Sequence, residues 1–157
     1  MTIKFRITLM TFLQFFVWGA WLITIANYWF GTKQWDGRLF GEVFATLGFS
    51  SLIMPALTGI IADKWMNAER LYGALHILGG IFLACLPMVD DPGTFRNVVF
   101  GAMLCYMPTI SLSNSIAYYI LKNNEYDVVK VFTPIRVWGT IGFVVALRVT
   151  NLTGNKA

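Results

Sequence analysis

Long apolar runs separated by short polar connectors set the pattern of this chain. A helix needs about 20 apolar residues to cross the hydrocarbon core of a bilayer. Five runs of roughly that length occur in the sequence, at residues 7–30, 41–62, 71–89, 98–121 and 134–152. The alternation of polar and apolar residues that marks membrane strands is missing from these runs. The pattern predicts an all-α membrane protein with about five transmembrane helices.

Composition supports this prediction and excludes several functions. Hydrophobic residues make up 57% of the 157 residues and charged residues 13%, whereas soluble domains average roughly 45–50% and about 25%. The basic residues are spread thinly between apolar runs, so a nucleic-acid partner is not expected. No serine, cysteine or carboxylate pair has the neighbouring base that catalysis requires, which argues against an enzyme. Cys85 and Cys105 lack a second ligand type nearby, so we expect no metal site and no cofactor.

The charges of the connectors predict a topology. The N-terminus and the second and fourth connectors carry six Lys and Arg residues, whereas the first and third carry three, namely Lys33, Arg38 and Arg96. Because positive charge favours the cytoplasmic side, we expect a cytoplasmic N-terminus. Two interpretations of the whole chain stay open. It is either a five-span protein in its own right or an incomplete N-terminal transmembrane domain, residues 1–157, of a larger transporter.

The fifth run carries the polar residues of greatest interest. We expect Pro134 in the first helical turn and Arg136 about one turn inside the helix. At 100° per residue, Arg136, Thr140 and Phe143 fall within an arc of about 60° and form a ladder of cation, hydroxyl and ring. Such a ladder suits a polar solute that contains a ring. Alternatively, Arg136 reaches back to the membrane surface or pairs with Asp127 or Glu125.

Two other runs also present polar faces. In the first, Gln14 and Trp18 share a helix face with Trp21 and Ile25, where an amide and an indole could bind a heterocycle. The alternative is that the tryptophans belong to an interfacial belt. In the fourth, a polar stripe either holds helices together or lines a cavity. Its residues are Ser111, Asn114, Ser115 and Tyr118.

Two further ionisable residues have plainer explanations. His76 could relay a proton, but no acid stands at helical spacing beside it, and a structural hydrogen bond is the alternative. Glu42 opens the second run near the outer face, where a solvated acid at a helix start is favoured by the helix dipole; the alternative is a coupling site.

Several segments resemble the nucleoside:proton symporters of the major facilitator superfamily. They run nearly the whole length of the chain, and the last of them is the most specific. In order they are Phe12-Leu13-Gln14-Phe15 with Trp18-Gly19, Met54-Pro55-Ala56-Leu57 with Ala62-Asp63-Lys64-Trp65, Tyr106-Met107-Pro108-Thr109, and Pro134-Ile135-Arg136 with Trp138-Gly139-Thr140-Ile141-Gly142-Phe143.

The segment from Gly59 to Arg70 also resembles the superfamily's loop signature between its second and third helices. It departs from that signature at Met66, where a glycine is usual, and at Ala68, where a basic residue is usual. The resemblance implies that Gly59, Asp63 and Lys64 belong to a conformational latch, with glycine allowing close helix approach and the partner lying in the other half of the molecule.

The resemblance implies a bacterial inner-membrane transporter of twelve helices in two halves, with the solute bound between the halves. Arg136, Thr140 and Phe143 would then contribute to a nucleoside site, and Gln14, Trp18 and Asn114 are further candidates for it. The implied partners are a nucleoside, a proton, the lipid bilayer and the missing C-terminal half, which would carry the coupling carboxylate. The alternatives are a facilitator for another polar solute, such as a sugar, and a structural protein that transports nothing.

Overall fold

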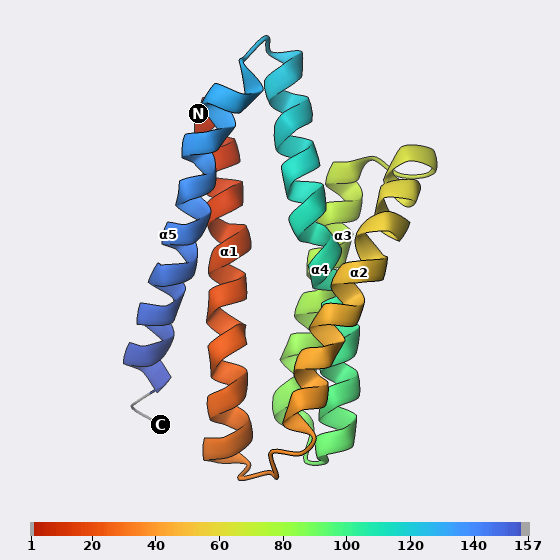
Figure 1. Cartoon of the computed structure of the whole chain (residues 1–157), viewed down its shortest axis with the longest axis vertical. Coiled ribbons are helices and arrows are strands. Elements are labelled where there is room, and N and C mark those ends of the chain that lie inside the picture. The colour runs from red at the N-terminus through yellow and green to blue at the C-terminus, as the bar shows by residue number, and fades with distance from the viewer. Residues whose placement is uncertain (1, 155–157) are drawn as a thin grey trace. The chain divides into compact units, whose positions relative to one another are not determined.

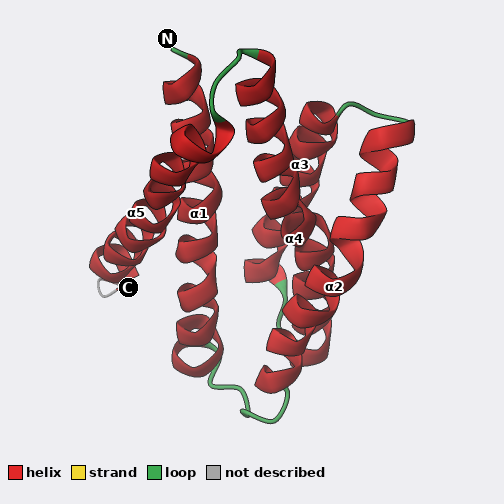
Figure 2. Ribbon diagram, turned by 45° about the horizontal axis from the view of Figure 1, so that its top comes forward, coloured by secondary structure: helices red, strands yellow, loops and turns green. Residues whose placement is uncertain are grey.

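The structure, a computed structural model, describes residues 2–154 and consists there of helices and connectors (Figures 1 and 2). All five long helices in this range are long and apolar enough to cross a membrane. The all-α prediction with five spans is therefore confirmed. The helices are α1 (Ile3–Asn27), α2 (Phe40–Lys64), α3 (Ala68–Cys85), α4 (Pro92–Asn123) and α5 (Val128–Gly154); a π-helical turn (Tyr28–Thr32) extends α1 and a 3₁₀ turn (Leu86–Met88) follows α3.

The helices extend beyond the apolar runs, most clearly at the start of α4 and α5. The Asp91 carboxylate accepts a 2.7 Å hydrogen bond from the Thr94 backbone N–H and so caps α4. Asp127 accepts a 3.1 Å bond from the Lys130 N–H in the same way at α5. Hydropathy marks only the part of a helix that suits hydrocarbon, whereas capping side chains decide where the helix begins.

The early start of α5 corrects one prediction. Pro134 lies inside the helix and not in its first turn. Arg136 consequently lies about two turns from the beginning of α5, one turn deeper than the sequence pattern suggests.

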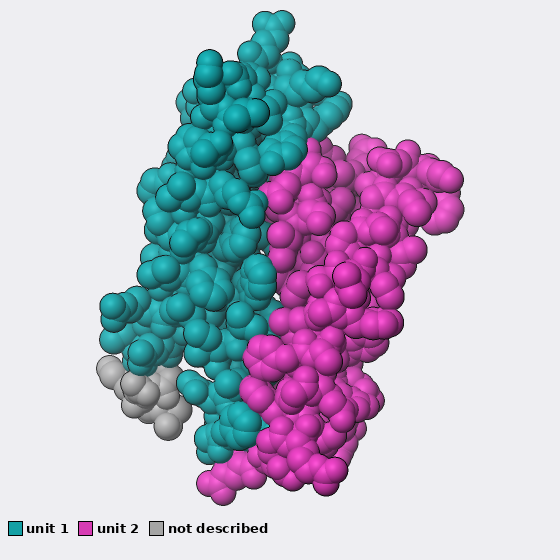
Figure 3. Space-filling view, in the orientation of Figure 1, with its two compact units in different colours: residues 1–32, 117–157 teal, residues 33–116 magenta. Residues whose placement is uncertain are grey.

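The described chain divides into two compact units, coloured separately in Figure 3. Unit 1 comprises Met1–Thr32 and Ala117–Ala157, and unit 2 comprises Lys33–Ile116. Unit 1 therefore holds α1, the end of α4 and α5, and unit 2 holds α2, α3 and most of α4.

In unit 1, helices α1 and α5 pack along a seam of small residues. An added Cβ at Gly19 would lie 2.7 Å from the Phe143 carbonyl oxygen, and one at Gly142 would overlap the carbonyl oxygen of Phe12. Glycine at such positions lets two backbones approach closely, which is how helices commonly associate in lipid. At one end of the seam a buried apolar cluster adds to the packing; it consists of Ile7, Ala117, Leu121, Phe132 and Ile135.

In unit 2, α3 packs against α4 through both apolar and small residues. Leu71 and Leu75 of α3 form a buried cluster with Leu112 of α4. The Phe82 ring lies over Gly101, where an added Cβ would come within 2.8 Å of the ring. The small residue thus makes room for the ring and fixes the register of the two helices.

Candidate functional site

Two members of the ladder on α5, Arg136 and Thr140, lie outside the seam with α1, and the third, Phe143, lies at its edge. Gly139, Gly142 and Ala146 are buried, whereas Arg136 and Thr140 are exposed and Phe143 is half-buried. All six residues belong to the unbroken helix α5, so the shared face of the three ladder residues follows from helical geometry. The close contact at Gly142 fixes the rotation of α5, and with it the direction in which this face points relative to α1.

Phe143 connects the ladder to α1 through an aromatic contact. Its ring meets the Trp18 indole edge to face, with centroids 6.4 Å apart and planes at 86°. Trp18 also contacts Phe15, one turn away on its own helix, at 5.9 Å. An edge-to-face pair of this kind is favoured by the quadrupoles of the two rings. The pair holds the Phe143 ring in place while one side of it stays accessible.

Arg136 takes no part in the ion pair considered from the sequence. Within residues 2–154 it forms no salt bridge with Asp127 or Glu125, and the Asp127 carboxylate pairs with Lys130 at 3.3 Å. Both partners of that pair lie in the first turn of α5 or just before it. The guanidinium group of Arg136 therefore keeps its hydrogen-bond donors for a ligand or solvent.

The other candidate face, on α1, is largely buried. Gln14 is 1% exposed, Trp21 is 9% exposed and Ile25 is 5% exposed, and Trp18 is half-buried. The four residues share one face of α1, as the spacing predicts. Of these, Trp18 is the residue that contacts the ladder on α5.

The polar stripe on α4 contacts another described helix through its aromatic member. The Tyr118 ring meets the Phe132 ring of α5 edge to face at 4.6 Å, whereas within residues 2–154 the side chains of Ser111, Asn114 and Ser115 make no hydrogen bond to another helix. Asn114, in unit 2, is half-buried, with its amide not engaged by the described residues. The neighbouring Thr109 is fully buried and donates a 2.6 Å bond to the Tyr106 carbonyl of its own helix.

His76 occupies a structural position in unit 2. Its Nδ1–H donates a 3.0 Å hydrogen bond to the Tyr72 carbonyl oxygen. The imidazole also contacts the Tyr72 ring at 4.3 Å and the Tyr106 ring at 6.2 Å. These contacts fit the hydrogen-bonded alternative considered from the sequence.

The three residues predicted to form a latch lie in the last two turns of α2. Asp63 and Lys64 are exposed and form no ion pair with any part of the described chain. No atom lies within 4 Å of a Cβ added at Gly59, so the close helix approach expected there is not made by the described helices. Residue type alone predicts the close approach, but a glycine with no helix packed against it has the same sequence signature.

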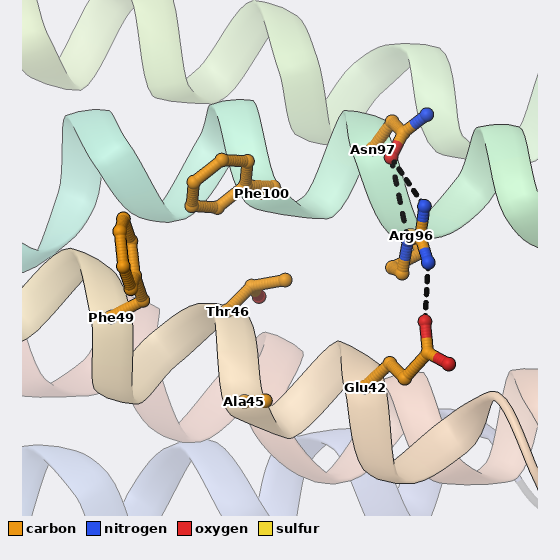
Figure 4. A pocket seen from close by; sticks show the side chains of 7 residues that line it. All are labelled: Glu42, Ala45, Thr46, Phe49, Arg96, Asn97 and Phe100. Carbon is orange, nitrogen blue, oxygen red and sulfur yellow. Dashed lines mark hydrogen bonds and ion pairs between the residues drawn. The ribbon is translucent and has the colours of Figure 1, made fainter.

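A second polar constellation, which the sequence did not reveal, lies in unit 2. Arg96 of α4 donates to the carboxylate of Glu42 on α2 and holds the side-chain oxygen of Asn97 through two further bonds of 3.2 and 3.3 Å (Figure 4). The prediction that Glu42 is an acid at a helix start is correct, but 54 residues separate it from Arg96. No local spacing could connect them.

The fold and these side chains place the chain in the class of helical membrane proteins, with a polar and aromatic ladder on its fifth span. A sequence model of the family described as Nucleoside H+ symporter matches residues 1–155, and the chain belongs to that family.

Individual relatives agree with this assignment. The chain is 43% identical over 154 residues to the nucleoside permease NupG of Escherichia coli (strain K12) and covers 98% of itself and 37% of that protein. It is 41% identical over 152 residues to the xanthosine permease of the same organism, with coverage of 97% and 36%. The chain thus spans little more than a third of the length of these relatives, which are permeases and not enzymes.

A solved structure shows the same arrangement of helices. The crystal structure of the nucleoside transporter NupG matches with a TM-score of 0.93 at 43% identity and covers 98% of this chain and 38% of that one. The resemblance stated from the sequence, both in family and in fold, is confirmed.

Proposed function

We propose that the complete gene product carrying this sequence imports nucleosides together with protons by alternating access. Residues 1–157 would form most of the first of its two helical halves, with the N-terminus in the cytoplasm of a bacterium and the helices in its inner membrane. Membership of the Nucleoside H+ symporter family supports this proposal, as do relatives that are a nucleoside permease and a xanthosine permease.

The nucleoside would bind to the ladder of Arg136, Thr140 and Phe143. A nucleoside combines hydroxyl and carbonyl groups with a flat heterocycle, so it needs both hydrogen-bond donors and an apolar surface. Arg136 and Thr140 are exposed at helical spacing and could offer the hydrogen bonds. The observation that carries the proposal is the Phe143 ring, which is half-buried and held edge to face by Trp18 beside these two polar groups.

Three other residues are further candidates for the site. Trp18 would act through Phe143, which it contacts directly. The Asn114 amide, half-buried and unengaged within residues 2–154, could hydrogen-bond a substrate. Gln14 is 1% exposed and lies one turn before Trp18, so it would position α1 and not touch the nucleoside in the arrangement described.

The remaining partners would come from outside residues 1–157. Gly59, Asp63 and Lys64 would form a latch with the other half, since the exposed charges at the end of α2 have no partner within the described chain. Asp63 at a helix C-terminus is disfavoured by the helix dipole unless a cation or a second helix N-terminus compensates. The carboxylate that couples transport to protons would also lie in that half.

Uptake of radiolabelled uridine by cells that express the complete gene product tests this proposal. Arg136→Ala should lower uptake at low uridine concentration by about tenfold or more, since a lost hydrogen bond to a charged group costs about 1.5–3 kcal/mol. Phe143→Ala should also lower uptake, because it removes the apolar surface offered to the base. Arg148→Ala is a matched control because Arg148 is an exposed cation on the same helix, away from the ladder. Normal uptake by both ladder variants, at equal protein levels, would refute the site.

Competition by unlabelled solutes tests the substrate class. Excess nucleoside should abolish uridine uptake, whereas an equal excess of glucose or xylose should leave it unchanged. If sugars competed as well as nucleosides, the alternative of a facilitator for other polar solutes would replace this proposal.

A further inference from the structure

The groove beside the Glu42–Arg96 pair belongs to unit 2 and shares no lining residue with the ladder. It has a volume of about 550 Å³ and is bounded by α2 and α4 (Figure 4); its lining residues are Glu42, Ala45, Thr46, Phe49, Arg96, Asn97 and Phe100. This volume is within the range of small-molecule sites, which is about 300–1,000 Å³. The groove is therefore large enough to hold part of a ligand.

The groove is polar at one end and apolar further along. Glu42 is the third residue of α2 and Arg96 the fifth residue of α4, so both charges stand close to the start of a span. Phe100 follows Arg96 by one helical turn, about 6 Å, and Phe49 follows Glu42 by two turns, about 10 Å. A molecule lying along the groove would place a polar end at the helix starts and an apolar end deeper along the spans.

The polar end presents two opposite charges that both retain bonding capacity. Side-chain exposure is 35% for Arg96 and 49% for Glu42, although the two are paired. Only one oxygen of the Glu42 carboxylate accepts the bond from Arg96. The other oxygen can accept a bond from an ammonium group, and the remaining N–H groups of Arg96 can donate to a phosphate. A zwitterionic headgroup complements the two charges at the polar end of the groove. A purely anionic headgroup would be repelled by the Glu42 carboxylate.

The apolar end does not suit a flat heterocycle. Phe49 and Phe100 contact each other with centroids 6.1 Å apart and planes at 61°, so the two rings leave no slot between them for a base. Phe49 is nevertheless 56% exposed. An acyl chain needs only an apolar surface to lie against, and the exposed ring provides one.

We propose that this groove binds a phospholipid with a zwitterionic headgroup that carries a primary ammonium, namely phosphatidylethanolamine. The phosphate accepts hydrogen bonds from Arg96, the ammonium donates to Glu42, and one acyl chain lies along Phe49 and Phe100. The groove is then a lipid site that distinguishes headgroups by their charge, and it is formed by other residues than the ladder proposed for the nucleoside.

Native mass spectrometry of the complete gene product from nanodiscs tests the proposal. The discs contain equal amounts of dioleoyl phosphatidylethanolamine, phosphatidylcholine and phosphatidylglycerol, so that only the headgroup differs. We expect phosphatidylethanolamine to be retained preferentially over both others. Phosphatidylcholine lacks the N–H donors for Glu42, and phosphatidylglycerol lacks the ammonium altogether. Equal retention of the three lipids would overturn the proposal without any variant.

Two variants and a matched control assign the retention to this groove. Arg96→Gln should lower phosphatidylethanolamine retention about tenfold, the factor expected for one lost charge-assisted hydrogen bond. Glu42→Gln should abolish the preference over phosphatidylglycerol. Lys33→Gln is the control, because it removes one partner of the Lys33–Asp90 pair, which does not line the groove. An equal loss in the control, or displacement of the bound lipid by millimolar uridine, would overturn the assignment.

Discussion

Phe143 of α5 and Trp18 of α1 meet edge to face, and this contact gives the polar ladder its fixed aromatic component. The two rings are held at that distance by the backbones behind them, because Gly19, the residue after Trp18, leaves room for the Phe143 carbonyl group. The ring contact and the backbone contact therefore depend on each other.

The first prediction concerns the coupling between these two rings. Trp18→Leu and Phe143→Leu each remove the aromatic pair, so the double variant should be less destabilised than the sum of the single variants. The expected coupling is about 0.5–1.5 kcal/mol. Denaturant unfolding of the purified complete gene product, followed for the four members of the cycle, measures it. Additive effects would show that the contact contributes nothing beyond separate burial of the rings.

The second prediction concerns the seam between α1 and α5. Gly142→Ala would bring the new methyl group into the backbone carbonyl oxygen of Phe12, which no side-chain rotation can relieve. The two helices must move apart, at a cost of about 1–3 kcal/mol. We expect a lower midpoint of thermal unfolding together with reduced uridine uptake.

Gly73→Ala on α3 is the control for this seam variant. No atom in the described chain lies within 4 Å of a Cβ added there. Alanine is favoured over glycine inside a helix by about 0.5–1 kcal/mol, so the control should be neutral or slightly more stable. A Gly142 variant as stable as this control would contradict the close packing of α1 and α5.

The third prediction concerns the C-terminus of α4. The chain ends this helix with two hydrogen bonds, from the Glu125 N–H to the Lys122 carbonyl and from the Tyr126 N–H to the Leu121 carbonyl, each 3.1 Å long. This is a Schellman arrangement, in which the residue at the position of Glu125 is usually glycine. Glu125 has a φ of 58°, in the left-handed region.

Glu125→Gly should therefore stabilise the protein by about 1 kcal/mol, because it relieves the left-handed strain and removes an acid from the negative end of the helix dipole. A rise in the midpoint of thermal unfolding measures this. Glu125→Ala separates the two causes, since alanine removes the charge but keeps the strain. If glycine proved no better than alanine, the strain would be negligible.

The fourth prediction concerns acid stability at the start of α4. The Thr94 backbone N–H, with smaller contributions from the Thr94 hydroxyl and the Gly93 N–H, lowers the pKa of the Asp91 carboxyl from its ordinary value of 3.8. A carboxyl whose pKa is lower in the folded protein stabilises the fold above its unfolded pKa. This stabilisation is lost as the pH falls through the folded pKa.

Asp91→Asn should keep the cap, because an asparagine oxygen also accepts the Thr94 N–H. The variant should unfold at nearly the same temperature as the unaltered protein at pH 7. Between about pH 5 and pH 3 its midpoint should fall less steeply, since its cap does not titrate. Thermal unfolding across this pH range measures the difference, and identical slopes would show that Asp91 does not contribute to acid sensitivity.

The sequence predicts the helices well and their ends less well. Five apolar runs suffice to predict five helices because hydropathy over about 20 residues is a local property. Hydropathy does not predict the start of α5 at Val128, because this helix begins with the hydrogen bond from the Lys130 N–H to Asp127. The apolar pattern therefore predicts Pro134 in the first turn, whereas the helix begins six residues earlier and continues through it.

In the candidate site, too, the sequence predicts some features and leaves others to the structure. Helical spacing is enough to place Arg136, Thr140 and Phe143 on one face of α5. It could not reveal that Trp18 contacts Phe143, or that Arg96 pairs with Glu42, because both contacts join residues far apart in the chain.

The sequence by itself determined that this is a helical membrane protein of the Nucleoside H+ symporter family. Composition, the length of apolar runs and short motifs are properties of the linear sequence and do not depend on contacts between distant residues. Only the tertiary structure decided which face of each helix is packed. The spans are apolar on most sides, so periodicity does not single out a buried face, and the choice is made by the fit of one backbone against another. At Gly19 and Gly142 that fit places α5 against α1, leaves Arg136 and Thr140 outside the seam and puts Phe143 at its edge.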